Sequence, residues 1–514
     1  MENYPIVARG SSNVIGVLRG WDRLVFRGCI PILSYLDAML LFLRHLGVLL
    51  KDYSEWALQL SEELKQACLN EAIRLDRPVK YLPSAGVRKD ELARQILRDS
   101  PVSEGLICTL TCLEPCRTFR KRGNRQNHRL ELRTEQTQCL HVYKYWLDSQ
   151  FGFMGARLQT WLPCEVQVWI NGREWLARRM DRKGIDYRRH DNCFPWIEDF
   201  PTAQRLFNQM QRTHWIRSLD RILSRLCPTY AKRFDGNTPY WTAFQTEWAT
   251  DVCFDSPDAL GSLYRPLVRG AMTALGCDDV LRFLKKRADF GGEVDSSFRR
   301  REEGVRVKHY AGGNSVKAYD KGETVLRIET TINQPGQFRV YRTKQGEEHG
   351  DKAWRPLRKS VVDLHRRAEV SQQINDRYEE ALASLDTTQA VIDLVAPICQ
   401  SIRREGVRYR ALRPWSEEDR RLMEAVSRAE YVAAGFTNSD IAGHLYPGEH
   451  GDKRDRGRIA SRVSYRIRLL RRHGLIRKVK NQRRYHVTTQ GRQMLTAILT
   501  AQHATVQQLN ALAA

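Results

Sequence analysis

The stretch NSVKAYDKGETVLRIETTIN, from Asn314 to Asn333, constrains the fold most, because apolar and polar residues alternate on both sides of a central turn. Side chains along a β-strand point alternately to the two faces of a sheet. In the second half, Leu326 and Ile328 share one face. Arg327 and Glu329 then share the other face, although charged residues are uncommon in an otherwise apolar strand. The stretch predicts two antiparallel strands with one apolar face and one charged face.

An earlier segment, EWATDVCF, has the same two-faced character. Its carboxylates alternate with Trp248 and Val252, which fall on the opposite face. If this segment pairs with the two strands of the 314–333 stretch in one antiparallel sheet, the polar faces of all three converge. The converging side chains would be Glu247, Asp251, Lys317, Tyr319, Lys321, Arg327 and Glu329.

Such a set of side chains has two interpretations. Carboxylates can hold Mg²⁺ or Mn²⁺, a tyrosine hydroxyl can attack phosphorus, and lysine or arginine can offset the charge that builds on the phosphate. The alternative is an exposed sheet face with cross-strand ion pairs, for example between Arg327 and a carboxylate. The residue pattern alone leaves both open.

The run HYAGGNSVKAYDKGETVLRIE resembles the "Y-x-G-x-x-S … Y-D-K … R-x-E" run of replication initiators from rolling-circle plasmids and filamentous-type phages. Its three parts begin at Tyr310, Tyr319 and Arg327, and the resemblance covers residues 309–333. Most metal-dependent nickases of this kind also carry a His-hydrophobe-His triplet. No such triplet occurs in this sequence, and His309 stands alone.

The resemblance implies an enzyme that nicks one DNA strand through a tyrosine, with a divalent metal ion held by acidic residues. Carried over by position, the nucleophile would be Tyr319 or Tyr310, and the sequence does not decide between them. The implied metal ligands are Glu329 with Glu247 or Asp251. With the cations that the residue pattern offers to offset charge on the phosphate, the catalytic candidates are Tyr319, Tyr310, Lys321 and Arg327.

The size and charge of the chain fit a partner of opposite charge. A chain of 514 residues is too long for one ordinary domain, so three or four are expected. The net charge is +24 and the pI about 9.7, which favours polyanions: nucleic acid first and an anionic membrane second. DNA is the favoured partner, with RNA left open.

No secretory signal is recognisable at the N-terminus, and the most apolar stretch, residues 29–50, carries Asp37 and Arg44. Because these charges would be costly in lipid, the stretch predicts a buried amphipathic helix, and we expect a cytoplasmic protein without a membrane partner. The twelve cysteines show no disulfide pattern and are expected to be free thiols. Cys108, Cys112 and Cys116 recur every four residues, but the second pair that a zinc knuckle requires is absent.

The expected fold class is α+β: several antiparallel-sheet domains, ferredoxin-like or replication-initiator-like, with helical insertions and a C-terminal winged helix–turn–helix. Trp161 and Trp169 lie on strands whose polar face could stack single-stranded nucleic acid, or they pack under a covering helix. The predicted parts are a mostly helical region (1–100), an α+β sheet domain (101–230), a second sheet part with the candidate site (231–350), a charged helical linker (351–412) and the winged domain (413–514).

Over roughly the last hundred residues, the predicted order is helix, short helix, long basic helix, hairpin and helix. Ser416 and Thr437 are the expected N-caps of the first two helices. This order, over residues 415–505, resembles the winged helix–turn–helix of MarR-type regulators. A homodimer through this domain is a further partner that the sequence leaves open.

In the long basic helix, Ile459, Val463 and Ile467 form an apolar stripe at helical spacing. The residues off this stripe can read base edges in a major groove, and basic residues of the hairpin can contact phosphates. A winged helix used for protein contact is the alternative. The nucleic-acid-binding candidates are Arg458, Arg462, Tyr465, Arg466, Lys480, Arg483 and Arg484, besides Trp161 and Trp169.

Taken together, these patterns predict a nucleic-acid-binding protein of a mobile element. It would nick or transfer a DNA strand by metal-assisted tyrosine chemistry and locate its site with the winged helix. The alternative is a DNA- or RNA-binding regulator, or a nucleoprotein scaffold, without catalysis.

Overall fold

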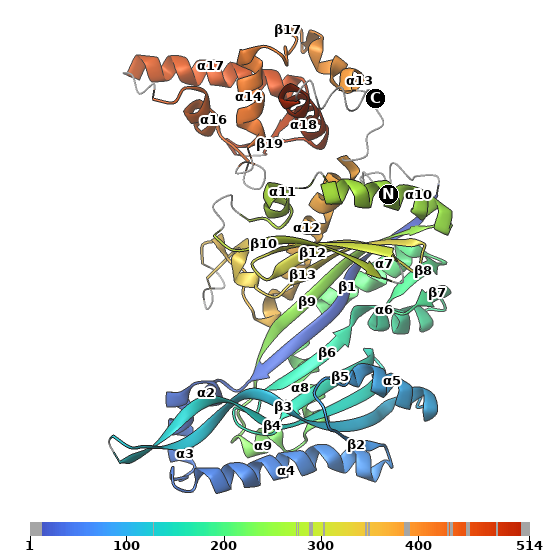
Figure 1. Ribbon diagram of the computed structural model, residues 1–514, viewed down its shortest axis with the longest axis vertical. Helices are drawn as coiled ribbons and strands as arrows, with labels where there is room; N and C mark the ends of the chain where they lie inside the picture. Colours follow the sequence, from blue (N-terminus) through green and yellow to red (C-terminus); the bar gives the residue numbers. More distant parts are fainter. Residues whose placement is uncertain are drawn as a thin grey trace.

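The computed structural model describes residues 13–126, 128–273, 275, 277–286, 291–301, 304–344, 347, 350–384, 391–428, 431, 435–448, 453–479 and 482–504. These residues form a mixed α+β structure, in which one large sheet is accompanied by several two-stranded sheets. Figure 1 shows the sheet rising from the N-terminal helices at the bottom toward a C-terminal group of helices at the top.

The large sheet has eleven strands in the order β10-β11-β12-β13-β9-β1-β6-β5-β4-β3-β2. All neighbouring strands pair antiparallel except β2 and β3, which are parallel. The strands are β1 (Val14–Cys29), β2 (Val79–Leu82), β3 (Gly105–Asn124), β4 (Arg129–Asp148), β5 (Gly152–Gln159), β6 (Val166–Asn171), β9 (Tyr240–Phe254), β10 (Val294–Arg301), β11 (Gly304–Ala311), β12 (Asn314–Lys321) and β13 (Val325–Ile332).

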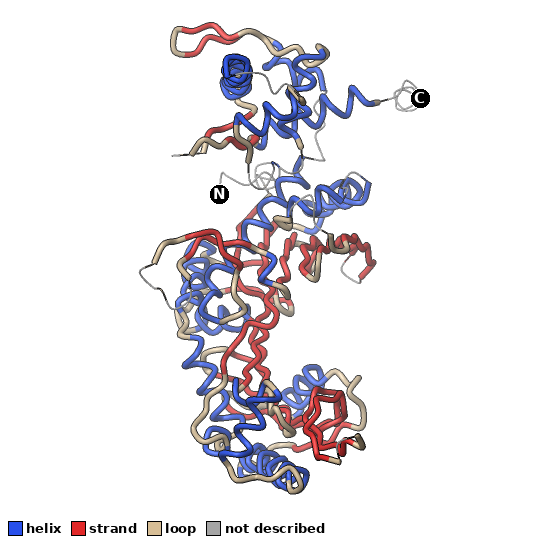
Figure 2. The backbone as a smooth tube through the Cα atoms, turned by 90° about the vertical axis from the view of Figure 1, so that its left-hand side faces the viewer, coloured by secondary structure: helices blue, strands red, loops and turns tan. Residues whose placement is uncertain are grey.

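The two expected sheet regions are thus parts of one sheet, joined by long central strands. β1 has 16 residues and β9 has 15, and the two pair along almost their whole length. Figure 2 shows the strands continuing from the lower to the upper part of the molecule. Because β1 comes from the first thirty residues, the N-terminal region contributes a central strand as well as helices.

Helices cover the sheet in two groups around separate hydrophobic cores. The lower core contains apolar residues of α4 and α8 with those of β4–β6, and the upper core contains residues of α10–α12 with those of β11–β13. The helices along this part are α2 (Pro31–Ser34), α3 (Leu36–His45), α4 (Tyr53–Arg74), α5 (Lys89–Asp99), α6 (Gly172–Asp181), α7 (Phe200–Asn208), α8 (Trp215–Leu226), α9 (Tyr230–Arg233), α10 (Pro257–Thr273), α11 (Cys277–Phe283) and α12 (Leu364–Ser384).

Helix α12 lies in the segment whose charge suggested a linker, yet it packs on the sheet. Its Ile374 and Tyr378 are fully buried in the upper core. Asn375 donates hydrogen bonds to the carbonyls of Trp248 on β9 and Ile328 on β13, at 3.2 and 3.1 Å. The charged residues occupy the rest of the helix surface. The high charge of the segment therefore gave no sign that one face of the helix is buried.

The C-terminal part has the predicted order of elements around its own core. Ser416 caps the first helix through the backbone N–H of Asp419, and Thr437 forms a capping box with Asp440, as expected. The elements are α13 (Val391–Val395), β16 (Ile402–Arg404), β17 (Val407–Tyr409), α14 (Glu417–Ser427), α16 (Asn438–Leu445), α17 (Lys453–Arg472), β18 (Ile476–Lys478), β19 (Tyr485–Val487) and α18 (Thr489–His503).

Two further hairpins are β7 (Tyr187–His190) with β8 (Cys193–Ile197), and β14 (Arg339–Arg342) with β15 (Ala353–Pro356). Among the helices in the described ranges, none is both long and apolar enough to cross a bilayer.

Candidate active site on the large sheet

The three two-faced strands pair as predicted, with β13 between β12 and β9. Lys317 lies opposite Glu329, and Tyr319 lies opposite Arg327. Arg327 in turn lies opposite Asp251 on β9. The apolar sides of the same strands face the helix-covered upper core. The polar sides therefore gather on the other face of the sheet, where they form a cluster of charged side chains.

Two of the predicted metal ligands come together, and a third carboxylate that the sequence did not indicate joins them. Carboxylate oxygens of Asp22, Glu247 and Glu329 all lie within 4.8 Å of one another. Hard oxygen donors of this kind suit Mg²⁺ or Mn²⁺. Asp251, the other predicted ligand, binds arginine instead and is not in this group.

Arg327 explains why a charged residue occupies an apolar strand. Its guanidinium is fully buried and donates to both carboxylate oxygens of Asp251, at 2.6 and 2.8 Å. It also donates to Asp22 Oδ1 at 3.3 Å and to the carbonyl of Asn192 at 2.8 Å. A bidentate arginine–carboxylate pair is among the stronger polar contacts in proteins, so Arg327 links β13 to β9, β1 and the β7–β8 turn.

A β-bulge in β1 presents Asp22 to the cluster. Trp21 pairs with Trp248 and Arg23 pairs with Glu247, so Asp22 is the extra residue between two consecutive partners. The side-chain amide of Asn192 donates to both of its carboxylate oxygens, at 2.8 and 2.9 Å. Strand parity could not place Asp22, and the one available signal was a lone carboxylate in the apolar run GWDRLVF.

Arg173, also missed from the sequence, enters at the start of α6. Its guanidinium is fully buried, with Nη2 2.9 Å from Asp251 Oδ2. Asn171 caps this helix by accepting hydrogen bonds from two backbone N–H groups. A Cβ at Gly172 would lie 1.9 Å from the carbonyl oxygen of Trp21, so only glycine lets α6 approach β1 this closely. The glycine thereby brings Arg173 beside the carboxylates.

The carboxylates of the cluster titrate differently. Burial, together with the neighbouring Glu329, raises the pKa of Glu247 to about 7 and also raises the pKa of Asp22. Burial opposes ionisation of Asp251 as well, but Arg173 and Arg327 outweigh it and lower its pKa. Lys317 and Arg327 likewise outweigh burial and lower the pKa of Glu329.

These directions bear on metal binding. Burial is the main reason that the pKa values of Asp22 and Glu247 are raised, and the neighbouring Glu329 charge adds to it. A divalent cation bound among the three carboxylates would offset both effects. The donor set and the electrostatics therefore fit an oxygen-liganded cation, held by Asp22, Glu247 and Glu329.

Tyr319 is the candidate nucleophile that lies in this cluster. Its hydroxyl donates to Glu329 Oε2 at 2.9 Å, and Glu329 Oε1 is 2.7 Å from Lys317 Nζ. Burial and the Glu329 charge raise the pKa of Tyr319. Lys321 points elsewhere, with its Nζ 2.8 Å from Asp191 Oδ2. The half-buried Tyr319 hydroxyl thus has an acceptor for its proton.

Tyr310 lies on the same face but farther out. It pairs with Ser315, which is four residues, or roughly 13 Å, along β12 from Tyr319. The lysine Nζ of Lys308 lies 4.5 Å from its ring centre. Although burial opposes it, contacts with Ser297 and Lys308 lower the pKa of Tyr310. The two tyrosines are too far apart to act on one phosphate.

Basic residues continue this face toward the edge of the sheet. Lys308 lies opposite Lys317, and Arg306 and Arg299 pair across β11 and β10. Arg299 is exposed, and Arg306 and Lys308 are half-buried. His309 belongs to the opposite face, where Ser296 and Tyr378 contact its two ring nitrogens. The carboxylate cluster is therefore bordered by a basic strip.

The two tryptophans predicted to stack bases lie far down the sheet in different surroundings. Trp161 is buried, donates to the carbonyl of Phe119 and is covered by the Arg120 guanidinium, 4.1 Å from the ring centre. Trp169 is half-buried and stacks on Tyr143. Trp161 therefore offers little free ring surface.

In the C-terminal part, the stripe of α17 is buried as predicted, with Val463 and Ile467 inside the core. Arg462 and Tyr465 are exposed, and Arg458 is exposed beside Asp455. Arg466 was expected to face outward and be free to bind nucleic acid, but it forms an ion pair within the protein. Its Nη2 lies 2.6 Å from Glu418, and its side chain is mostly covered.

The β18–β19 hairpin carries the remaining candidates. Arg483 is exposed, and Arg484 donates to the carbonyl of Gly435 at 3.1 Å. Lys480 lies outside the described residues. Of the described hairpin candidates, Arg483 is thus the exposed one.

Comparison with protein-family models, with curated proteins and with solved structures found no match for this chain.

Proposed function

We propose that this chain is a nucleic-acid-binding protein of a mobile element, similar to rolling-circle replication initiators, that cleaves one DNA strand through Tyr319. One observation carries the proposal: the Tyr319 hydroxyl donates to Glu329 at 2.9 Å, inside a group of three carboxylates suited to a divalent cation. Nucleophile, proton acceptor and metal ligands then share one sheet face.

In the proposed step, Tyr319 Oη attacks phosphorus as its proton passes to Glu329. A bond forms between the tyrosine oxygen and phosphorus, and the bond to the leaving sugar oxygen breaks, with that oxygen taking up a proton from water. A Mg²⁺ or Mn²⁺ ion bound to Asp22, Glu247 and Glu329 would polarise a phosphate oxygen. Lys317, beside Glu329, is the cation best placed to offset charge on the phosphate.

The surroundings of the cluster support a polyanionic substrate. The strip of Arg299, Arg306 and Lys308 runs from the sheet edge toward Lys317 on the same face. A basic groove or strip that follows a backbone is the usual means of holding a single strand. The half-buried Lys317, Tyr319 and Glu247 are the cluster members that such a strand would reach first.

The C-terminal part would find the target. Helix, helix, basic helix and hairpin occur in the order of a winged helix–turn–helix, and α17 exposes Arg458, Arg462 and Tyr465. Within the described part of the chain, Arg462 has no ion pair or hydrogen bond that would withhold it from DNA. We therefore propose that α17 enters a major groove.

A cleavage assay tests the proposal. Labelled single-stranded DNA, supercoiled DNA and single-stranded RNA are incubated with the full chain and Mg²⁺, Mn²⁺ or EDTA, and the products are resolved for cut strands and for covalent protein adducts. We expect metal-dependent cleavage with an adduct, which Tyr319→Phe abolishes and Tyr310→Phe preserves. Glu329→Gln should abolish cleavage and spare duplex binding. Cleavage by Tyr319→Phe at the wild-type rate would refute the assignment.

A second candidate, binding without cleavage, is favoured by the charge balance of the cluster. Three cations, Arg173, Arg327 and Lys317, already face the four carboxylates, so the network holds together with little need of a ligand. In that case the sheet face holds nucleic acid for a regulator or scaffold. Binding without cleavage on every substrate, with any metal, would establish this second function.

A further inference from the structure

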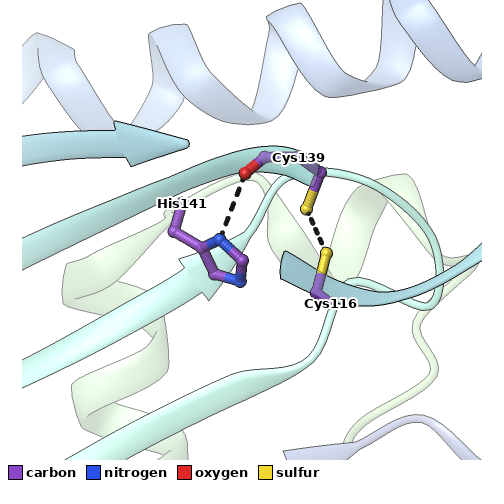
Figure 3. A group of neighbouring side chains, drawn as sticks. All are labelled: Cys116, Cys139 and His141. Atoms are coloured by element: carbon purple, nitrogen blue, oxygen red, sulfur yellow. Dashed lines mark hydrogen bonds between the residues drawn. The ribbon is translucent and has the colours of Figure 1, made fainter. Parts of the chain in front are cut away.

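Two cysteines and a histidine meet on the long β3–β4 pair, far down the sheet from the carboxylates. Cys116 belongs to β3, and Cys139 and His141 to β4. One side-chain donor atom of each lies within 4.8 Å of the others. Figure 3 shows the two sulfur atoms facing each other across the strands, with the imidazole of His141 beside them. The residues come from two strands, so no C-x2-C spacing marks them in the sequence.

The histidine has the protonation that a metal ligand needs. His141 is almost completely buried, and its Nδ1 lies 3.3 Å from the carbonyl oxygen of Cys139. A carbonyl can only accept, so Nδ1 carries the proton and Nε2 keeps its lone pair. Burial, with Arg157 nearby, lowers the pKa of His141 to about 4, so the ring is neutral at pH 7.

This arrangement matches the way metal-binding histidines are usually oriented, with the second ring nitrogen donating to a carbonyl or carboxylate. Within the described part of the chain, Nε2 of His141 has no hydrogen-bond partner of its own. The lone pair on this nitrogen, beside two thiols, is therefore available to a metal ion.

The two thiols are in direct contact. Their sulfur atoms are 2.7 Å apart, and Cys116 is half-buried whereas Cys139 is buried. The hydrogen bond from Cys139, with Arg157 and Arg120 nearby, lowers the pKa of Cys116, whereas the same contact raises the pKa of Cys139. Two sulfur atoms this close to each other and to the imidazole can bind the same soft cation, which would displace the thiol protons.

We propose that Cys116, Cys139 and His141 bind one Zn²⁺ ion, with the fourth coordination position open on the Cys116 side. Two thiolates and an imidazole are a donor set that selects zinc, unlike the oxygen ligands of the carboxylate cluster. Binding releases two protons, one from each thiol. Zn–S bonds of about 2.3 Å place two sulfurs about 3.8 Å apart, so loading separates the thiols by roughly 1 Å.

Metal binding by the reduced full-length chain tests this proposal. The chain is loaded with Zn²⁺, desalted and analysed for zinc, and in parallel titrated with Co²⁺. We expect one zinc per chain and a near-ultraviolet thiolate-to-cobalt charge-transfer band. Cys116→Ser, Cys139→Ser and His141→Gln should each weaken binding by more than about 100-fold. Cys108→Ser, a buried cysteine of the same strand, should bind as the wild type does.

The Co²⁺ titration of the unmodified chain decides the outcome even if a variant fails to fold. Absence of the charge-transfer band in the reduced wild-type chain would overturn the proposal. So would a Cys116–Cys139 disulfide that persists under reducing agent, found by counting thiols, or equal zinc content in Cys116→Ser and wild type. The readout is independent of DNA cleavage, so it stands apart from the proposed function.

Discussion

Replacing Arg327 by methionine probes the charged cluster most directly. Methionine has a similar length, so the loss is chiefly of charge and hydrogen bonds rather than of volume. The change removes two contacts with Asp251, one with Asp22 and one with the carbonyl of Asn192. After the change, Arg173 is the remaining guanidinium partner of the buried carboxylates of Asp22 and Asp251.

The magnitude follows from that residual partner. Removing one member of a buried ion pair costs about 3–5 kcal/mol, because the other charge stays buried without compensation. Arg173 remains 2.9 Å from Asp251, so the lower end of that range, about 3 kcal/mol, is expected. At about 1.4 kcal/mol per tenfold, this corresponds to roughly 150-fold faster opening of the central strands.

Native-state hydrogen exchange, read by mass spectrometry on peptides from β9 and β13, measures this local opening. The comparison is Arg299→Met, an exposed arginine on the same sheet face, which should alter exchange less than about threefold. The double variant Arg327→Met/Asp251→Asn removes one charge of each sign and should recover part of the loss. A change below about tenfold in Arg327→Met, or one matched by Arg299→Met, would refute the reasoning.

Three further predictions use the same exchange assay or a binding assay. The folded-state pKa of Glu247 is about 7, against about 4.3 unfolded, so the folded chain holds a proton between these values that the unfolded chain has lost. Stability of the central strands should therefore fall as pH rises from about 4.3 to 7. Glu247→Gln should flatten that slope, and an unchanged slope would contradict the assignment. Gly172→Ala should cost about 1–3 kcal/mol, since its Cβ would meet the Trp21 carbonyl, whereas Gly261→Ala, in open space on α10, should cost nothing. Equal effects of the two substitutions would count against the close approach. Arg462→Ala should weaken DNA binding by about 1–3 kcal/mol if it reads a base, or lower the salt slope by about one unit if it contacts phosphate, with exchange in the C-terminal core unchanged. Unaltered affinity and salt slope would exclude Arg462 from the interface.

Local patterns in the sequence determined the strands and helices that carry the candidate sites. Strict alternation in residues 314–333 implied strands whose charged side chains share a face, and the register confirms this for Lys317, Tyr319, Arg327 and Glu329. Caps at Ser416 and Thr437 and the stripe of α17 were equally readable. These features depend on residues close in sequence, because alternation and capping are properties of a single strand or helix.

Only the tertiary structure decided which groups meet. Asp22 joins Glu247 and Glu329 because a bulge in β1 interrupts the alternation that sequence patterns rely on. Arg173 reaches Asp251 because Gly172 lets a helix approach a strand from a different part of the chain. Cys116 meets Cys139 and His141 because β3 and β4, which carry them, pair side by side. Short-range periodicity determines which face a side chain occupies, but long-range pairing and backbone irregularities determine its neighbours, and those neighbours set the chemistry of both sites.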